Sequence, residues 1–219
     1  MDLQLKGKKV VIAGASSGLG FACARQLALE GARVVINGRN TDKLSKAVSL
    51  LSSETGGEIF AIAGDVADPE FAPRLISQAA EKMGGLDILI TNAGGPPVGS
   101  IENLDESAWQ QAINLSLMSH VRLIKAAIPH LRQSQTASVL TITSYSVKQP
   151  IANMILSNSI RAATVGLTKT LALELGKDHI RFNSILPGWT QTERVIALMQ
   201  ARVDANGTSI EQELEKQAK

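Results

Sequence analysis

A glycine-rich turn near the N-terminus carries the first residues whose spacing suggests chemistry. The segment AGASSGLG, residues 13–20, lies between an apolar run and a segment with helical periodicity. Glycines let the backbone turn tightly and approach a phosphate, while a helix N-terminus offers free N–H groups and the positive end of its dipole. A turn without a ligand is the alternative, but the order strand, turn, helix at the start of a sheet favours a dinucleotide site. The residues expected to hold the pyrophosphate are Gly14, Ser16, Ser17, Gly18, Leu19 and Gly20.

A second position bears on the choice of cofactor. In dinucleotide-binding folds that prefer NAD, an acid at the end of the second strand binds the ribose hydroxyls and repels a 2′-phosphate. Here the strand ends in VVINGRN, with Gly38 where that acid is expected, followed by Arg39 and Asn40. A guanidinium pairs well with a phosphate. We therefore expect NADP(H) to be preferred over NAD(H). The alternative is that Arg39 is only a solvated surface charge.

The elements that must position these residues follow an alternating pattern. Apolar, β-branched runs alternate with longer segments of helical periodicity, which predicts a parallel sheet covered by helices on both faces. Right-handed crossovers then give a doubly wound α/β fold, a Rossmann-type three-layer sandwich. We expect strands at 8–14, 33–38, 58–65, 86–94, 138–144 and 180–188, and helices at 18–32, 41–56, 68–85, 105–133 and 153–176. With no linker visible, residues 1–219 are expected to form a single domain.

Composition narrows the classes of function. The 219 residues are 44% hydrophobic with a net charge of +2, which argues against nucleic-acid binding. The apolar runs are too short to span a membrane, and no targeting segment is recognisable, so we expect a cytoplasmic protein with no membrane partner. The histidines, His120, His130 and His179, lack metal-ligand spacing, and we expect no metal site.

Three motifs in order resemble the short-chain dehydrogenase/reductase family. They are G-x-x-x-G-x-G in the first turn, TNAG at 91–94 and PGW at 187–189, and the likeness runs from about residue 5 to 195. The resemblance implies that Asp65 and Val66 contact adenine, and that Asn92, Ala93 and Gly94 line the adenosine and ribose side. It also implies that Pro187 and Gly188 border the nicotinamide, and that Thr190 and Thr192 contact its carboxamide or the diphosphate.

The same resemblance locates a catalytic region that departs from the family. Family members use a serine at the end of the fifth strand, a Tyr-x-x-x-Lys pair on the next helix and an asparagine on the preceding helix. Ser144 and Asn114 match the serine and the asparagine. Ser157, thirteen residues after Ser144, stands in the tyrosine position, and Arg161 stands in the lysine position.

Three interpretations of this departure remain open. Tyr145, the only tyrosine, could replace the missing one, although it lies in a loop beside Ser144. Alternatively, Ser157 and Arg161 run a modified reaction, with a proton from Lys148 or from water on Asn114. Third, the protein binds NADP(H) without turnover, in a regulatory or scaffolding role. We favour an oxidoreductase that interconverts carbonyl and alcohol groups at a divergent site.

The resemblance also suggests substrates and assembly. The segment LTKTLALELGKDHIRFNSILPG, residues 167–188, is similar to that of 3-oxoacyl-(acyl-carrier-protein) reductase-like members. This implies a small carbonyl or alcohol substrate, possibly an acyl thioester, and a homodimer or homotetramer formed through the two long helices. Residues 190–219 are expected to be lid helices on the substrate side, with the family's last strand absent from the sequence.

Overall fold

The computed structural model describes residues 1–218, with the side chains of 201, 205 and 216–218 outside the description. The chain divides into two compact units, Met1–Pro187 and Gly188–Lys219, and each is described by itself. The first unit holds the sheet, and the second holds two helices.

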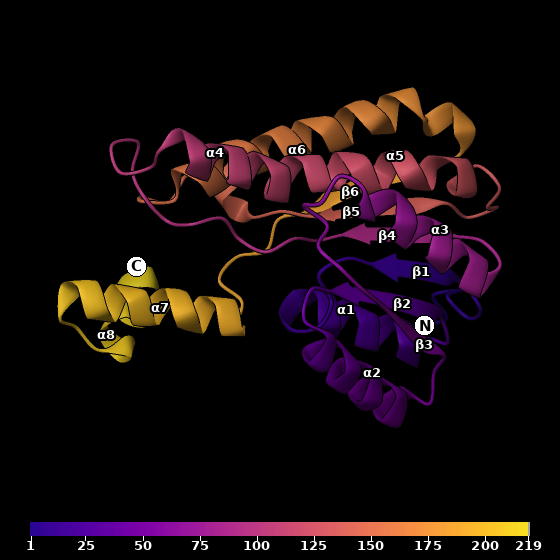
Figure 1. Ribbon diagram of the computed structural model, residues 1–219. Coiled ribbons are helices and arrows are strands. Elements are labelled where there is room, and N and C mark those ends of the chain that lie inside the picture. Colours follow the sequence, from indigo (N-terminus) through magenta and orange to yellow (C-terminus); the bar gives the residue numbers. More distant parts are fainter. Residues whose placement is uncertain (219) are drawn as a thin grey trace. The chain divides into compact units, whose positions relative to one another are not determined.

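The first unit is built on a parallel sheet of six strands in the order β3-β2-β1-β4-β5-β6 (Figure 1). This order reverses between β1 and β4, which is the point where α/β sheets of this type bind ligands beyond the carboxyl ends of the strands. The strands are β1 (Lys9–Ile12), β2 (Arg33–Gly38), β3 (Ile59–Ala63), β4 (Ile88–Thr91), β5 (Ser138–Ile142) and β6 (Arg181–Ile185).

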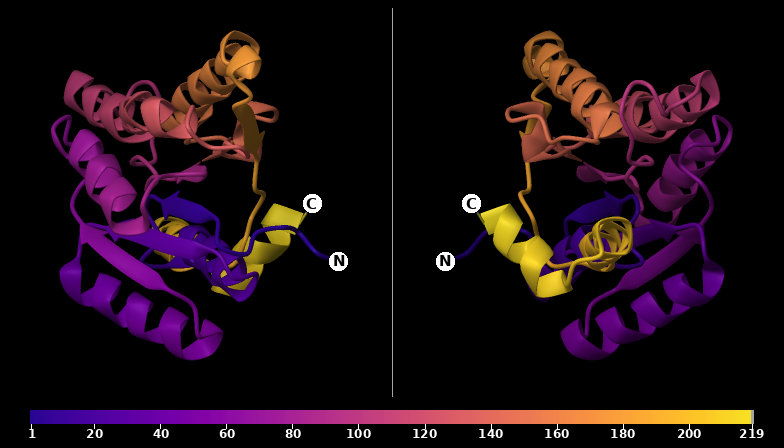
Figure 2. Two further views of the ribbon diagram at one scale, coloured as in Figure 1. Left: turned by 90° about the vertical axis from the view of Figure 1, so that its right-hand side faces the viewer. Right: turned by 90° about the vertical axis from the view of Figure 1, so that its left-hand side faces the viewer.

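Helices cover both faces of the sheet because alternate strand residues are apolar on both sides. On one face, Val10 and Ile12 pack with α1 (Gly18–Leu29) and α2 (Thr41–Thr55). On the other, Val11 packs with α3 (Phe71–Met83), α5 (Ser119–Leu131) and the partly buried leucines of α6 (Ile155–Glu174). Both side views show α2 and α6 on opposite faces (Figure 2). The expected doubly wound α/β fold is confirmed.

The helix expected at 105–133 is not a uniform α-helix. It consists of α4 (Glu106–Ile113), a π-helical turn (Asn114–Met118) and α5, with Pro129 in the last turn of α5. A π-turn inserts one extra residue into a helical turn and is frequent at functional sites. The helical segment expected at 105–133 thus runs from Glu106 to Leu131, and the π-helical turn that begins at Asn114 is a feature the expectation did not include.

The second unit consists of α7 (Glu193–Asn206) and α8 (Ile210–Ala218). The carboxylate of Glu213 joins them, because its Oε1 accepts from Thr208 Oγ1 at 2.7 Å and from Asn206 Nδ2 at 3.3 Å. The Arg202 guanidinium lies 5.1 Å from the centroid of the Trp189 ring. No helix among the described residues combines the length and hydropathy that a membrane span requires.

Candidate dinucleotide-binding and catalytic site

The glycine turn after β1 has the geometry of a phosphate cradle. Gly14 and Gly18 both have φ of +58°, a conformation that side-chain-bearing residues rarely adopt. A Cβ on Gly20 would lie 2.4 Å from the carbonyl oxygen of Gly14, so only glycine allows α1 to begin this close to β1. The turn therefore presents bare backbone at a helix N-terminus, which fits a dinucleotide pyrophosphate.

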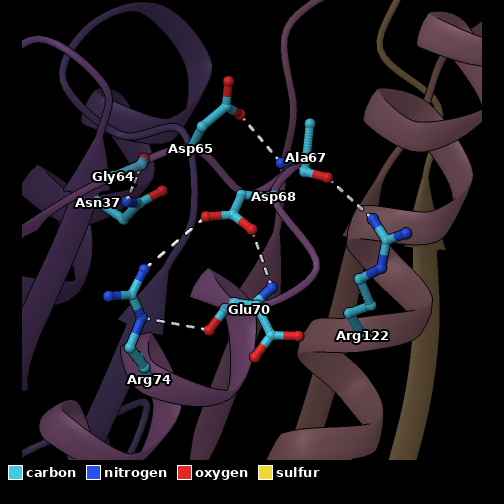
Figure 3. A network of polar contacts seen from close by, with 8 residues as sticks. All are labelled: Asn37, Gly64, Asp65, Ala67, Asp68, Glu70, Arg74 and Arg122. Carbon is cyan, nitrogen blue, oxygen red and sulfur yellow. Dashed lines mark hydrogen bonds and ion pairs between the residues drawn. The ribbon is translucent and has the colours of Figure 1, made fainter.

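Two amide side chains, one of them buried, hold the cradle to its neighbouring strands. Asn92 Nδ2 donates to Gly14 O at 2.9 Å, which ties the turn to the end of β4. Asn37, with 1% of its surface exposed, accepts from Gly14 N at 3.4 Å and donates to Ile62 O and Gly64 O on the β3 side (Figure 3). Asn37 is not among the residues expected at the site, although an asparagine inside an apolar strand is a usable signal, since buried amides are normally hydrogen-bonded.

The end of β2 packs closely against the glycine turn. A Cβ on Gly38 would lie 3.0 Å from both Cβ and Oγ of Ser16, so a side chain there would require the serine to shift by a few tenths of an ångström. The next residue, Arg39, has 72% of its side chain exposed, and its Nη1 lies 3.9 Å from Asp65 Oδ2. Asn40 caps α2 by accepting from Lys43 N at 2.8 Å. Of the two polar residues expected here, Arg39 extends toward solvent and Asn40 is engaged by the helix.

The loop after β3, where the adenine is expected, is braced from two directions. Asp65 Oδ1 accepts from Ala67 N at 2.9 Å, and Val66 between them is buried. Arg122, on α5, donates to Ala67 O at 3.0 Å (Figure 3). The second terminal nitrogen of Arg122 donates to Asn114 Oδ1 at 3.1 Å. The amide oxygen of the expected catalytic asparagine is thus engaged by an arginine of its own helical segment.

The end of β5 places Ser144 in a 3₁₀ turn. Ser144 Oγ accepts from Ser146 N at 3.2 Å, capping the turn Tyr145–Val147. Tyr145 N donates to Pro187 O at 3.1 Å, which joins this turn to the segment after β6. Tyr145 is therefore a residue of the 3₁₀ turn and not of the helix that carries Ser157.

The inner face of α6 carries both of the residues expected in place of the family's tyrosine and lysine. Ser157 is 4% exposed and Arg161 is 8% exposed. Arg161 donates to the carbonyls of Ile142 and Thr143 at 3.3 and 3.4 Å and to that of Gly94 at 3.5 Å. A guanidinium stays charged at physiological pH. The structure thus places a buried positive charge where β4 and β5 end.

Three buried polar atoms near this charge have no hydrogen-bond partner among the described residues: Ser116 Oγ, His120 Nε2 and Ser146 Oγ. His120 is 1% exposed, and its Nδ1 lies 2.7 Å from Thr91 Oγ1. Burial, with a smaller effect from the Arg161 charge, lowers the pKa of His120 to about 3, so the imidazole is neutral at pH 7. From the sequence, His120 is weighed only as a metal ligand, and Ser116 and Ser146 are not among the residues expected at the site.

Backbone contacts hold the loops that flank the catalytic region. Gly99 N donates to Asn153 O at 2.7 Å, joining the loop after β4 to the segment that precedes α6. Asn158 Nδ2 donates to Ile151 O at 2.8 Å, which pins the same segment to the first turn of α6. These contacts connect the ends of β4 and β5 across the N-terminus of α6.

Three of the expected site residues, Gly188, Thr190 and Thr192, lie in the second unit. Thr192 Oγ1 accepts from Val195 N at 3.4 Å and caps α7, and Thr190 Oγ1 donates to Gly188 O at 3.4 Å. Their hydroxyls therefore make local contacts, while the residues of the first unit form one cluster at the carboxyl ends of the strands. These strand ends carry the glycine turn after β1, the loop after β3 and the buried guanidinium of Arg161.

Comparisons with known proteins agree with this arrangement. The family profile of short chain dehydrogenase matches residues 8–202. Dehydrogenase/reductase SDR family member 2, mitochondrial, of Homo sapiens is 33% identical over 190 residues, covering 86% of this chain and 67% of that protein. Among solved structures, L-sorbose reductase from Gluconobacter frateurii complexed with NADPH and L-sorbose has a TM-score of 0.93 at 33% identity, covering 99% of this chain and 82% of that one.

A further matched structure holds the other nicotinamide cofactor. It is carveol dehydrogenase from Mycobacterium avium in complex with NAD, with a TM-score of 0.78 at 26% identity, covering 83% of this chain and 70% of that one. Both cofactors thus occur among the structures that this fold matches. The profile match over most of the chain and the identity to the human relative show that this chain belongs to the short chain dehydrogenase family.

Proposed function

We propose that the protein is an NADP(H)-dependent oxidoreductase that interconverts a carbonyl and an alcohol. The observation that carries the proposal is the buried guanidinium of Arg161, which lies on the same helix face as Ser157 and bonds to the carbonyl of Gly94. A reducing site needs a group that stabilises the negative charge developing on the substrate oxygen, and a buried cation supplies this. The alternative is a relative that binds NADP(H) without turnover, in a regulatory or scaffolding role.

The cofactor would be held by the first unit's strand-end residues. The cradle of Gly14, Gly18 and Gly20 takes the pyrophosphate, and Asp65 and Val66 border the adenine. NADPH, when bound, supplies the hydride. Arg39 would neutralise the 2′-phosphate, and Gly38 supports the preference for NADP(H) because it stands where an acid would select NAD.

The catalytic roles fall to the hydroxyls and the cation at the end of β5. Ser144 and Ser157 would hydrogen-bond the substrate oxygen, and Arg161 would stabilise its developing charge. A serine hydroxyl is a much weaker acid than a phenol, so the proton would come from water or Lys148 rather than from Ser157. Loss of a matched general acid lowers the rate by about 10²–10⁴, and we expect a correspondingly low kcat.

The test is NADPH oxidation with a panel of acetoacetyl thioesters, simple ketones and L-sorbose. Turnover that disappears in Arg161→Leu supports the oxidoreductase. A protein that binds NADPH, as followed by its fluorescence, but oxidises none of the panel above the rate in buffer supports the non-catalytic alternative. Turnover of acetoacetyl thioesters alone would assign the 3-oxoacyl reductase-like specificity that residues 167–188 suggest.

The cofactor preference has its own prediction. Arg39→Ala should weaken NADPH binding by about 10- to 100-fold, which corresponds to the loss of charge-assisted hydrogen bonds to a phosphate. Binding of NADH should change less than twofold, because NADH lacks that phosphate. Titration calorimetry with both cofactors measures this, with Arg25→Ala on α1 as the control for loss of an exposed arginine. Equal weakening of both cofactors would contradict the assigned role.

A further inference from the structure

Arg122 makes contacts that no part of the proposed chemistry uses. Its side chain is partly buried, and it joins two segments far apart in the sequence: the loop after β3 through Ala67 O at 3.0 Å and the π-helical turn through Asn114 Oδ1 at 3.1 Å. Figure 3 shows the guanidinium reaching from α5 to the loop whose Asp65 accepts from Ala67 N. One side chain therefore spans from the adenine-side loop to the turn that contains Asn114.

The far side of the π-helical turn contacts the catalytic helix. Thr164 Oγ1 donates to Ser116 O at 2.8 Å, and Thr164 lies one turn beyond Arg161 on the inner face of α6. A π-turn depends on packing because its hydrogen-bond register differs from that of the flanking α-helix. The turn is thus held between two hydrogen bonds, one from Arg122 and one from α6.

We propose that Arg122 is a positioning residue that couples the adenine-side loop to the π-helical turn at the catalytic end of the site. The inference rests on the proposed cofactor site and adds to it a link between its two ends. The planar fork of a guanidinium offers separate nitrogens to the two acceptors, whereas a lysine ammonium offers its donors from a single nitrogen. A ligand that orders the loop at Asp65 and Ala67 would hold the Arg122 guanidinium in place. Arg122 would in turn hold the side-chain amide of Asn114.

The link predicts measurable coupling between the two halves of the cofactor. Adenosine 2′,5′-bisphosphate occupies the adenine end and reduced nicotinamide mononucleotide occupies the hydride end. Coupling is the ratio of the mononucleotide Kd without and with saturating bisphosphate. In the wild-type protein we expect the bisphosphate to tighten mononucleotide binding about five- to tenfold, at the lower end of measured couplings. In Arg122→Leu the ratio should fall to about one.

Further variants separate positioning from stability. Asn114→Ala breaks the same bridge from the other side and should also abolish the coupling, so the test survives if Arg122→Leu does not fold. Arg122→Lys should retain only part of the coupling. Arg132→Leu removes another guanidinium of the same helical segment, one that pairs with Asp178 at 2.9 Å, and should leave the ratio unchanged.

Each outcome bears on a different claim. A folded Arg122→Leu protein with the wild-type ratio would overturn the inference, as would a wild-type ratio of one when both fragments bind. A wild-type protein that binds neither the fragments nor NADPH would overturn the proposed function together with the coupling that rests on it. Coupling that is lost in both bridge variants and kept in Arg132→Leu would establish Arg122 as the link.

Discussion

At the scale of single residues, burial decides what the polar groups of this site can do. His120 is enclosed between α5 and the end of β4, with its Nδ1 at Thr91 Oγ1. Protonating it would bury a second positive charge close to Arg161. The neutral imidazole therefore belongs to the folded state, and the folded protein resists taking up a proton that the unfolded chain accepts.

The difference between the pKa of His120 in the folded protein and in the unfolded chain predicts how stability changes with pH. The ordinary histidine pKa is 6.5 and the folded value is about 3, so stability falls as pH decreases from 6.5 toward 3, where only the unfolded chain binds the proton. Between pH 7 and pH 5 this single group should cost the wild-type protein about 2 kcal/mol. In His120→Gln the part of the stability loss that comes from this histidine should disappear.

Urea unfolding at pH 7 and at pH 5 measures how much unfolding free energy the wild-type protein and the variant each lose on acidification. His130→Gln, a change at a second histidine of the same helix, is the matched control. If His120→Gln lost as much stability on acidification as the wild-type protein, the histidine would not be the group responsible.

At the scale of secondary-structure elements, α6 acts as the organising helix of the catalytic end. Ser157, Arg161, Thr164 and Thr168 are buried along one face at spacings of three and four residues. Threonine is a moderate helix former, but here its hydroxyls have partners in other elements, since Thr168 Oγ1 lies 3.0 Å from Thr141 Oγ1 on β5. The polar stripe ties α6 to the π-helical turn and to the sheet.

A near-isosteric substitution tests this stripe. Thr164→Val keeps the shape of the side chain but leaves the buried carbonyl of Ser116 without its donor, which should cost about 1–3 kcal/mol of unfolding free energy. Thr170→Val removes an exposed hydroxyl that bonds only within α6, to Gly166 O, and should change stability by less than about 0.5 kcal/mol. Equal effects in denaturant titrations would argue against the role of the stripe.

At the scale of the whole molecule, the outer face of α6 points to self-association. Small exposed residues, Ala162, Ala163 and Gly166, lie on the same helix as Leu173, which is 75% exposed. Small side chains allow close approach of another helix, and exposed apolar surface marks protein contacts. The homodimer or homotetramer expected from the family resemblance remains a prediction, and this face is where we place its contact.

Gly166→Arg tests the contact without disturbing the fold. A Cβ on Gly166 would meet no heavy atom within 4 Å, and replacing glycine inside a helix favours folding by up to about 1 kcal/mol. The variant should therefore sediment as a monomer while its stability is unchanged or raised. Gly176→Arg, at another glycine with open space around it, should sediment like the wild-type protein. A Gly166→Arg protein that still assembles would place the contact elsewhere.

Local sequence patterns were sufficient to predict the fold of this protein. The order of strands and helices follows from apolar periodicity, and the phosphate cradle follows from glycines whose backbone angles and close contacts exclude side chains. Asn92 follows the fourth strand and donates to Gly14 O, while its role toward a cofactor stays a prediction. These features depend on neighbours in sequence or on the regular register of a parallel sheet, and both are encoded locally.

Only the tertiary structure decided which polar groups meet. The π-helical turn, the bridge from Arg122 to Ala67 and Asn114, and the contact of Arg161 with the ends of β4 and β5 all join segments distant in sequence. Asn37 and His120 likewise acquire their roles from burial between elements. The sequence by itself determined the fold, and the place of the site at the carboxyl ends of the strands stays a prediction from it. The hydrogen-bond partners and protonation states of the polar groups depend on packing, because hydrogen bonds and desolvation act through space rather than along the chain.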